Sequence, residues 1–270
     1  MKNWLYNKTV LVTGASSGIG KELCRLLITR YHANVIGIGR SIDKMERFVT
    51  ELGEYANNFS YLLFDVSSKT EWLRFAKDLV RSGKKISLLI NNAGIFPSFK
   101  TVENTPDEIM EAVMQTNFYS IVYSIETLSA LLFTDKTGSI VNICSSAALC
   151  TIVGTAPYSA SKSALKAYTE ALSLEKKGNY IGIIFPGTTK TELFRSDAQT
   201  ENSALDKIAM PAPKMAKKIL RKIIKKKRRA VIGWDAKAMN FVAKIAPVKG
   251  LFFIRWVMKK SKSKVLKSVF

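Results

Sequence analysis

Residues 9–20 have the sequence Thr-Val-Leu-Val-Thr-Gly-Ala-Ser-Ser-Gly-Ile-Gly, a short apolar run that leads into a glycine-rich turn. Leu23, Leu26 and Leu27 follow at helical spacing, so the pattern predicts a strand, a turn and a helix. Glycines in such a turn permit a tight bend and close approach of the backbone to a phosphate, and the helix N-terminus offers free N–H groups to it. The stretch therefore predicts a dinucleotide site rather than a purely structural turn, formed by Gly14, Ser16, Ser17, Gly18, Ile19 and Gly20.

Further apolar runs predict that strands and helices alternate along the chain. Strands are expected at 34–38, 59–64, 86–90, 139–143 and 180–185; helices are expected at 20–31, 43–52, 71–80 and 158–175, with one or two more within 105–132. Such alternation indicates a parallel sheet covered by helices on both faces, and continuously apolar strands agree with this. We therefore expect an α/β fold with a doubly wound parallel sheet, and one dinucleotide-binding catalytic domain at residues 1–233.

Residues 188–213 interrupt this alternation. They are polar and end in Pro211-Ala212-Pro213. A long irregular stretch directly after a strand is a typical place for a lid or a substrate loop. We therefore expect residues 188–213 to form the substrate loop.

A phenol and an ammonium group lie four positions apart in the run Tyr158-Ser159-Ala160-Ser161-Lys162. Four residues are about one helical turn, so both side chains share one face of the predicted helix. A phenol titrates near ~10 in water, and a fixed cation beside it favours the phenolate. The pair is therefore a candidate for general acid–base chemistry, although exposed helices also carry such pairs by chance.

Five motifs in this order resemble those of the short-chain dehydrogenase/reductase family. They are T-G-x-x-x-G-x-G at 13–20, N-N-A-G at 91–94, a helical asparagine at 117, a serine thirteen residues before the Tyr-x-x-x-Lys pair, and P-G-x-x-x-T at 186–191. The resemblance covers residues 8–191. It implies a Rossmann-like fold and reversible hydride transfer between a nicotinamide and a carbonyl or secondary alcohol.

The resemblance also implies a role for each matching side chain. Tyr158 would exchange a proton with the substrate oxygen, and Lys162 would lower the phenol pKa and hold the nicotinamide ribose. Ser145 would hydrogen-bond the substrate oxygen; Ser146 competes for this role, but the thirteen-residue interval favours Ser145. Asn117 would bind a water that links Lys162 to solvent. Tyr158 and Lys162 would also contact the cofactor, together with the glycine turn and Asp65, Val66, Asn92, Ala93, Gly94, Pro186, Gly187, Thr189 and Thr191.

The end of the second predicted strand indicates which nicotinamide cofactor is used. An acidic residue there would hydrogen-bond the ribose of NAD and repel a 2′-phosphate. This chain has Gly39-Arg40-Ser41 instead. The planar guanidinium of Arg40 can bind a phosphate, and Ser41 can add a hydroxyl group. We therefore expect NADP(H), with a solvated surface arginine as the alternative for Arg40.

Almost all of the net charge of +21 lies in the last quarter of the chain. Residues 207–270 hold 20 lysines and arginines and one acidic residue, Asp235, whereas residues 1–206 are nearly neutral. Residues 215–226 have the pattern of an amphipathic helix, and 229–233 that of a last strand. Residues 234–270 exceed what the sheet needs and form a basic extension with an apolar stretch at 251–258.

Three interpretations of this extension remain open. Aromatic and aliphatic groups bordered by lysines are typical of a helix that lies in a membrane interface. An apolar arm could instead cover the substrate pocket or a neighbouring subunit, and a basic patch could bind nucleic acid, which we favour least. An apolar arm near the pocket favours a lipophilic substrate such as a steroid, a bile acid or a long-chain keto-lipid.

The remaining composition favours a cytoplasmic protein, on the membrane surface in the first interpretation. Cys24, Cys144 and Cys150 fit no zinc pattern, and with His32 as the sole histidine no metal site is expected. No signal peptide or spanning segment is expected. Resemblance implies a homodimer or homotetramer through the two long helices. The predicted function is NADP(H)-dependent carbonyl–alcohol interconversion; the alternative is a catalytically silent NADP(H)-binding sensor on a membrane or nucleic acid.

Overall fold

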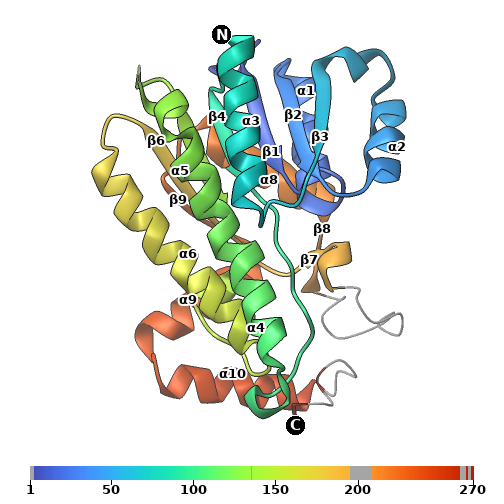
Figure 1. The fold of residues 1–270 in the computed structure, drawn as a ribbon. Coiled ribbons are helices and arrows are strands. Elements are labelled where there is room, and N and C mark those ends of the chain that lie inside the picture. Colours follow the sequence, from blue (N-terminus) through green and yellow to red (C-terminus); the bar gives the residue numbers. More distant parts are fainter. Residues whose placement is uncertain (1–2, 135, 195–207, 262–265, 267–268) are drawn as a thin grey trace.

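A seven-stranded parallel sheet forms the centre of the protein (Figure 1). The computed structural model describes residues 3–134, 136–194, 208–261, 266 and 269–270. The strand order is β3-β2-β1-β4-β5-β6-β9. Strands β2 and β3 are added on one side of β1, and the chain then returns to place β4 on its other side, which is the point where the strand order reverses. The strands are β1 Thr9–Thr13, β2 Asn34–Gly39, β3 Phe59–Leu63, β4 Leu88–Asn91, β5 Ser139–Ile143, β6 Tyr180–Pro186 and β9 Arg229–Ile232.

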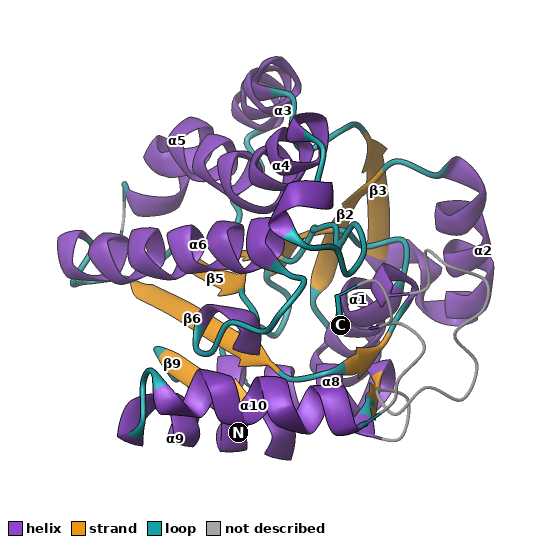
Figure 2. Ribbon diagram, turned by 90° about the horizontal axis from the view of Figure 1, so that it is seen from below, coloured by secondary structure: helices purple, strands orange, loops and turns teal. Residues whose placement is uncertain are grey.

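Helices cover both faces of the sheet, which confirms the predicted doubly wound α/β fold (Figure 2). One apolar cluster joins a face of the sheet to α1 (Gly18–Tyr31), α2 (Ile42–Leu52) and α8 (Ala212–Ile224). A second cluster joins the opposite face to α3 (Lys69–Ser82), α5 (Ser120–Phe133) and α6 (Ala156–Glu175). The predicted strands and helices lie within a few residues of these bounds, because their apolar periodicity reflects burial against the sheet.

The predicted helical region 105–132 is one continuous run with an irregular turn inside it. Helix α4 (Asp107–Met114) passes into a π-helical turn, Gln115–Tyr119, and then directly into α5. A π turn widens the helix by one residue and is found frequently at functional sites. Here it contains the buried Asn117.

The ends of the predicted substrate loop lie next to each other. Strand β7 (Thr189–Lys190) pairs in parallel with β8 (Met210–Pro211), and a short 3₁₀ turn covers Glu192–Phe194. The part of the loop between them, residues 195–207, lies outside the described residues.

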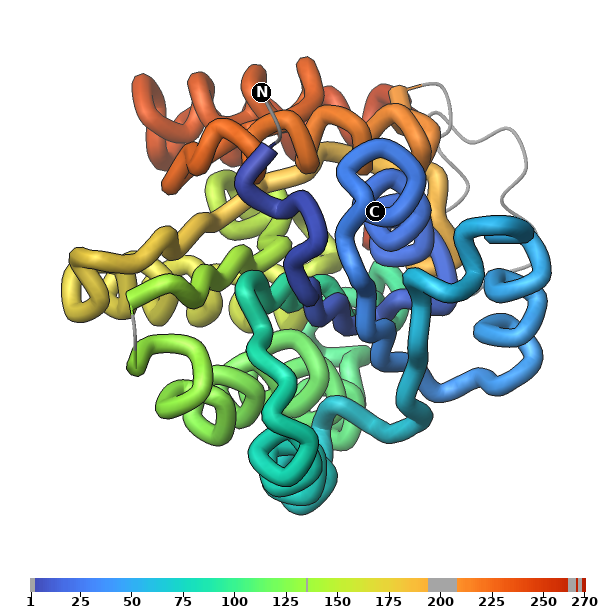
Figure 3. The backbone as a smooth tube through the Cα atoms, turned by 90° about the horizontal axis from the view of Figure 1, so that it is seen from above, coloured from blue at the N-terminus to red at the C-terminus, as the bar shows by residue number. Residues whose placement is uncertain are grey.

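The basic extension forms two further helices. Helix α9 (Trp234–Ile245) follows β9 directly, and α10 (Lys249–Lys260) packs on α9 where Gly250 meets Val242. Figure 3 shows the N-terminal segment beside the helices of the last quarter, where the Trp4 indole donates to the Ile224 carbonyl at 3.1 Å. Among the described residues, no helix has both the length and the apolar character that a bilayer span needs.

A chain of buried polar side chains crosses the centre of the sheet. Ser124 on α5 donates to Asn91 at 3.0 Å, Asn91 donates to Asn142 at 2.9 Å, and Asn142 donates to Thr169 on α6 at 2.9 Å. All four residues are buried. The chain satisfies polar groups that would otherwise be costly to bury, and it links α5 and α6 through β4 and β5.

Candidate active site

The predicted site residues come together at one edge of the sheet. Nearly all of them directly follow the carboxyl ends of β1 to β6, and these ends meet at one edge because the strands are parallel. The reversal between β1 and β4 lies among them. In open α/β sheets, ligands bind in the crevice at such a reversal point.

The turn between β1 and α1 is built for close backbone contact. Gly14 adopts φ +66°, a left-handed conformation that favours glycine. A Cβ on Gly20 would lie 2.1 Å from the Gly14 carbonyl oxygen, so α1 can begin against the turn only with glycine at that position. Ser17 precedes the first turn of α1, and its side chain makes no capping hydrogen bond in the described structure. The free N–H groups of this helix end are thus available to an anion.

Thr13 joins this turn to the N-N-A-G loop. Its Oγ1 accepts hydrogen bonds from the backbone N–H groups of Asn92 at 2.9 Å and Ala93 at 3.0 Å, and the Asn92 amide donates back to the Thr13 carbonyl at 3.0 Å. We did not assign Thr13 to the site from the sequence. Its place directly before Gly14, at the end of a buried strand, was the available signal.

Arg40 and Asp65 lie at the neighbouring ends of β2 and β3. The guanidinium of Arg40 is mostly exposed and lies 3.6 Å from the Asp65 carboxylate. Partial burial opposes ionisation of Asp65, but hydrogen bonds from Ser67 and the charge of Arg40 together hold its pKa below the ordinary value. Ser41 caps α2, where its Oγ accepts from the Lys44 N–H at 3.4 Å. The guanidinium of Arg40 is thus exposed at the same edge of the sheet as the dinucleotide turn.

Ser145 and Tyr158 contact each other directly. Tyr158 is buried in the first turns of α6, and its phenol forms a hydrogen bond with the Ser145 side chain. The Ser145 hydroxyl also accepts from the Ala147 N–H at 3.1 Å. Burial raises the pKa of Tyr158 to about 12, and the Ser145 hydrogen bond opposes this rise. The geometry pairs Tyr158 with Ser145 rather than with Ser146.

Lys162 lies on the same side of α6 as Tyr158. Its Nζ is 5.9 Å from the centre of the Tyr158 ring and donates to the Ile143 carbonyl at 3.3 Å. Burial lowers the pKa of Lys162. In the protein without ligand, burial dominates the pKa of the phenol, and the expectation that Lys162 lowers it stays a prediction.

Both the oxygen and the nitrogen of the Asn117 side-chain amide form hydrogen bonds within the protein. Its Oδ1 accepts from the Ile95 N–H at 2.8 Å, and its Nδ2 donates to the Ile95 carbonyl at 2.9 Å and to Ser161 at 3.1 Å. A Cβ on Gly94 would lie 3.1 Å from the Asn117 amide oxygen and 3.5 Å from Lys162 Nζ. Asn117 thus fixes the loop after β4 against α6 next to Lys162, which we did not foresee.

The segment after β6 completes the site. Thr189 Oγ1 donates to the Gly187 carbonyl at 2.9 Å, and the Thr188 N–H donates to Asp235 at 2.6 Å. Thr191 lies opposite Gly18, and its buried Oγ1 has no hydrogen-bond partner within the described parts of the chain. A buried hydroxyl without a protein partner, facing a glycine-rich helix end, fits a dinucleotide that would supply the missing partner.

An apolar cluster surrounds the phenol of Tyr158. Phe96 meets the Tyr158 ring edge-on, with ring centres 5.2 Å apart. Two residues of the C-terminal segment, Leu266 and Val269, are buried in the same cluster, and Met258 of α10 packs against it. The apolar composition of this tail was the one signal for this contact in the sequence. The further buried members of the cluster are Phe99 and Ala147.

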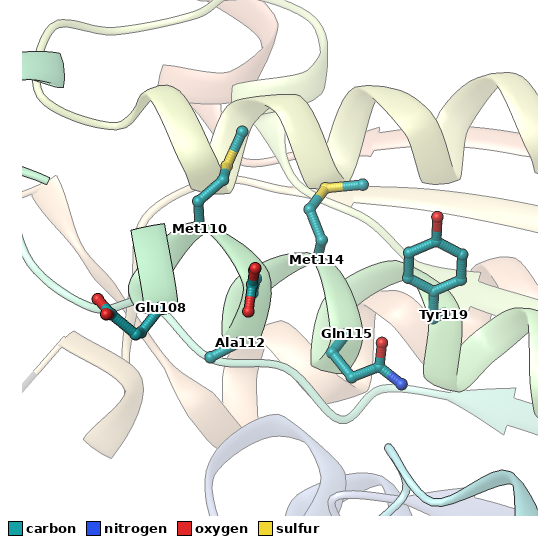
Figure 4. A pocket seen from close by; sticks show the side chains of 7 residues that line it. Glu108, Met110, Ala112, Met114, Gln115 and Tyr119 are labelled. Carbon is teal, nitrogen blue, oxygen red and sulfur yellow. The ribbon is translucent and has the colours of Figure 1, made fainter. Parts of the chain in front are cut away.

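A depression on α4 is separate from this site. Its lining is Glu108, Met110, Glu111, Ala112, Met114, Gln115 and Tyr119, and none of the four catalytic candidates is among them. Figure 4 shows Met110, Met114 and Tyr119 pointing to the same side of the helical run. The depression carries no catalytic group of the predicted set.

Comparison with known proteins agrees with this geometry. Residues 8–202 match the family model described as short chain dehydrogenase. An uncharacterized oxidoreductase of Staphylococcus saprophyticus is 32% identical over 195 residues, which are 71% of this chain and 78% of the relative. The 3beta-hydroxysteroid dehydrogenase of Mediterraneibacter gnavus is 30% identical over 201 residues, 74% of this chain and 70% of the relative.

A solved structure gives the same result. The actinorhodin polyketide ketoreductase with NADPH superposes with a TM-score of 0.72 at 26% identity, over 83% of this chain and 95% of that chain. The family match covers both the glycine turn and the Ser145–Tyr158 pair. The chain therefore belongs to the short chain dehydrogenase family, as an oxidoreductase that acts on CH–OH or C=O groups.

Proposed function

We propose that the protein is an NADP(H)-dependent oxidoreductase that interconverts a carbonyl group and a secondary alcohol on a lipophilic substrate. The observation that carries this proposal is the buried Ser145–Tyr158 hydrogen bond inside an apolar cluster. A proton donor and a second hydroxyl meet there beside a buried ammonium, at the ligand-binding edge of the sheet.

The proposed cofactor site uses the loops at the carboxyl edge. The turn at Gly14 and Gly18 would receive the pyrophosphate, Arg40 the 2′-phosphate, and Thr191 the nicotinamide end, where its buried hydroxyl has no protein partner among described residues. When bound, the nicotinamide supplies or accepts the hydride. The structural likeness to a ketoreductase with NADPH supports this choice of cofactor.

The protein's own residues would handle the proton. A pKa of about 12 keeps the Tyr158 phenol protonated at neutral pH, so its proton is available to an oxygen that gains negative charge during reduction. Ser145 can donate a hydrogen bond to the same oxygen. The ammonium of Lys162, held by the Ile143 carbonyl, would stabilise the phenolate that remains.

The substrate class follows from the walls around the phenol. Phe96, Phe99 and Leu266 surround Tyr158 with hydrocarbon, and such surroundings favour ligands that bury apolar surface. A steroid, a bile acid or a long-chain keto-lipid fits this description, and the steroid dehydrogenase relative supports it. The test is NADPH oxidation with a panel of steroids, long-chain ketones, small sugars and acyl-carrier substrates. A clear preference for the polar members would contradict the lipophilic assignment.

The alternative is a protein that binds NADP(H) without turnover. The enzyme is favoured because Tyr158 already contacts Ser145, and a silent binding protein has no need of this contact. Tyr158→Phe should keep NADPH binding, measured by fluorescence, and lose nearly all ketone reduction. Tyr168→Phe, on the same helix, is the matched control and should retain activity. Equal rates for the parent chain and Tyr158→Phe would refute the catalytic proposal.

We also propose a homodimer or homotetramer through the long helices that carry Asn117 and Tyr158. Exposed apolar side chains on this surface support the proposal: Met110 and Tyr119 lie in the α4–α5 run, and Leu174 lies on α6. Light scattering on the purified chain measures its mass in solution. Leu174→Glu should lower that mass if the helices form the subunit interface.

A further inference from the structure

The outer surface of α9 and α10 exposes large apolar side chains. On α9, Trp234, Phe241 and Ile245 lie seven and four positions apart, which places them on one helical face. On α10, Phe253 and Trp256 stack with ring centres 6.0 Å apart. The exposed fractions are 63% for Phe241, 67% for Ile245, 68% for Phe252, 55% for Phe253 and 52% for Trp256.

Basic side chains border this apolar surface. Lys249, Phe253, Trp256 and Lys260 follow one another at helical spacing, so a lysine lies at each end of an aromatic stripe. The ammonium of Lys260 lies 4.2 Å from the centre of the Trp256 ring. Such lysines can keep their charged ends in water while their hydrocarbon stems extend the apolar surface.

Carboxylates of the described residues do not neutralise the charge on this surface. The one acidic residue of the last quarter, Asp235, is buried and accepts from the Thr188 N–H. Across the described residues, no ion pair joins a lysine or arginine of α9 or α10 to a carboxylate. An occupant of this surface must therefore be apolar at its centre and negatively charged at its border.

The inner side of α10 belongs to the active site. Met258 packs against the apolar cluster that contains Tyr158, while Phe252 and Trp256 are exposed. Figure 1 shows α10 at the end of the molecule where α4 and α6 begin, and Figure 2 shows it next to α9. One helix thus contacts the active-site cluster through Met258 and exposes aromatic rings to the surroundings.

We propose that α9 and α10 dock the protein onto the surface of an anionic phospholipid bilayer. The aromatic and aliphatic groups would enter the boundary between headgroups and acyl chains, and the bordering lysines and arginine would bind the headgroups. The mouth of the active site would then lie against the lipid from which a lipophilic substrate enters. That last step depends on the proposed function; the docking itself does not.

Flotation of the full chain with vesicles tests the proposal. We expect it to float with mixed phosphatidylcholine–phosphatidylglycerol vesicles, and much less with phosphatidylcholine alone. Raising the salt concentration should weaken the binding. Two double variants should each lower the fraction of protein bound to vesicles by about tenfold or more. They are Phe252→Glu with Phe253→Glu, and Lys259→Glu with Lys260→Glu.

Matched controls lie on α3, which ends at the opposite, amino edge of the sheet, and, for Lys84, in the segment just after that end. Leu73→Glu with Val80→Glu replaces two exposed apolar side chains, and Lys77→Glu with Lys84→Glu reverses two exposed charges. Both should float within about twofold of the parent chain, since charges more than a Debye length from the lipid are screened. If the α3 and α10 variants lose vesicle binding equally, the binding depends only on the net charge of the protein, and the proposal is overturned.

Two other occupants are distinguishable. If the lipid-free chain is an oligomer and the Phe252–Phe253 variant alone converts it to a monomer, the surface joins two copies, and the proposal fails. If duplex DNA competes fully with the vesicles and binds more tightly, the ligand is nucleic acid, and the proposal also fails. All variants should still reduce a small water-soluble ketone. If the parent chain itself does not reduce the ketone, the proposed function is contradicted and the lipid result remains valid.

Discussion

The Asp235 carboxylate accepts a hydrogen bond from the backbone N–H of Thr188 at 2.6 Å. Asp235 is buried in the first turn of α9, and Thr188 directly follows the Pro186-Gly187 turn. A Cβ on Gly187 would lie 2.2 Å from Asp235, so the two segments touch. The basic extension is therefore fixed to the loop that we assign to the nicotinamide.

Asp235→Ala should weaken both the fold and cofactor binding. The variant leaves the Thr188 N–H without its acceptor, and a buried donor without a partner costs about 1–3 kcal/mol. We expect the free energy of unfolding, measured by urea denaturation, to fall by that amount. The dissociation constant of NADPH should rise. Asp235→Asn keeps an acceptor oxygen and should recover most of both. Equal effects of Ala and Asn would show that charge, not the hydrogen bond, matters.

Gly20→Ala should abolish NADPH binding. The new Cβ would lie 2.1 Å from the Gly14 carbonyl oxygen, so the turn or the start of α1 must move. Gly178→Ala is the control, because the nearest atom to its Cβ is 3.5 Å away. NADPH fluorescence titration and circular dichroism measure binding and folding separately. Unchanged NADPH affinity in Gly20→Ala would contradict the assigned cofactor turn.

Arg40→Asp should shift the cofactor preference from NADPH toward NADH. It removes the proposed phosphate contact and places a carboxylate that repels the 2′-phosphate. A charged hydrogen bond is worth about 1.5–3 kcal/mol, so kcat/KM for NADPH should fall roughly tenfold to a hundredfold. Arg74→Asp, with a similarly exposed arginine on α3, should leave the ratio of the two cofactors unchanged. An unchanged ratio in Arg40→Asp would assign Arg40 to the solvated surface.

The Tyr158 phenol should stay protonated until strongly alkaline pH in the protein without ligand. Its pKa is raised to about 12 in the folded state, against ~10 in the unfolded chain. The protonated phenol therefore stabilises the fold fully below pH ~10, and this contribution of roughly 2–3 kcal/mol is lost as pH rises toward 12. Ultraviolet difference titration of the parent chain against Tyr158→Phe measures the pKa. Phenolate absorbance from Tyr158 at pH near 8 would contradict it.

The sequence was sufficient for the sheet and for the set of candidate residues that meet at its carboxyl edge. Each strand is a short apolar run followed by a turn. Because the strands are buried on both faces, this pattern can be read from a few consecutive residues. The glycine turn and the Ser145–Tyr158 interval are also local features, so their proximity follows once the strands are parallel. The π turn at Asn117 has no local signal, because it depends on how the loop at Ile95 packs against α6.

Long-range burial accounts for what the sequence could not provide. The pKa of Tyr158 depends on how completely the fold excludes water, and a spacing of four residues does not reveal this. The contact of Leu266 with the Tyr158 cluster joins residues more than a hundred positions apart. The partner of Asp235 is likewise distant in the chain, although a lone acidic residue in a basic segment was a visible signal.

The polar chain from Ser124 to Thr169 bears on how the enzyme is prepared for its reaction. It connects α5 to α6, the two helices whose neighbouring turns carry Asn117 and Tyr158, through the central strands. Helices tied in this way cannot slide past each other without leaving buried amides unsatisfied. The candidate catalytic groups are thus preorganised: their arrangement is set once, during folding, and need not be rebuilt in each turnover.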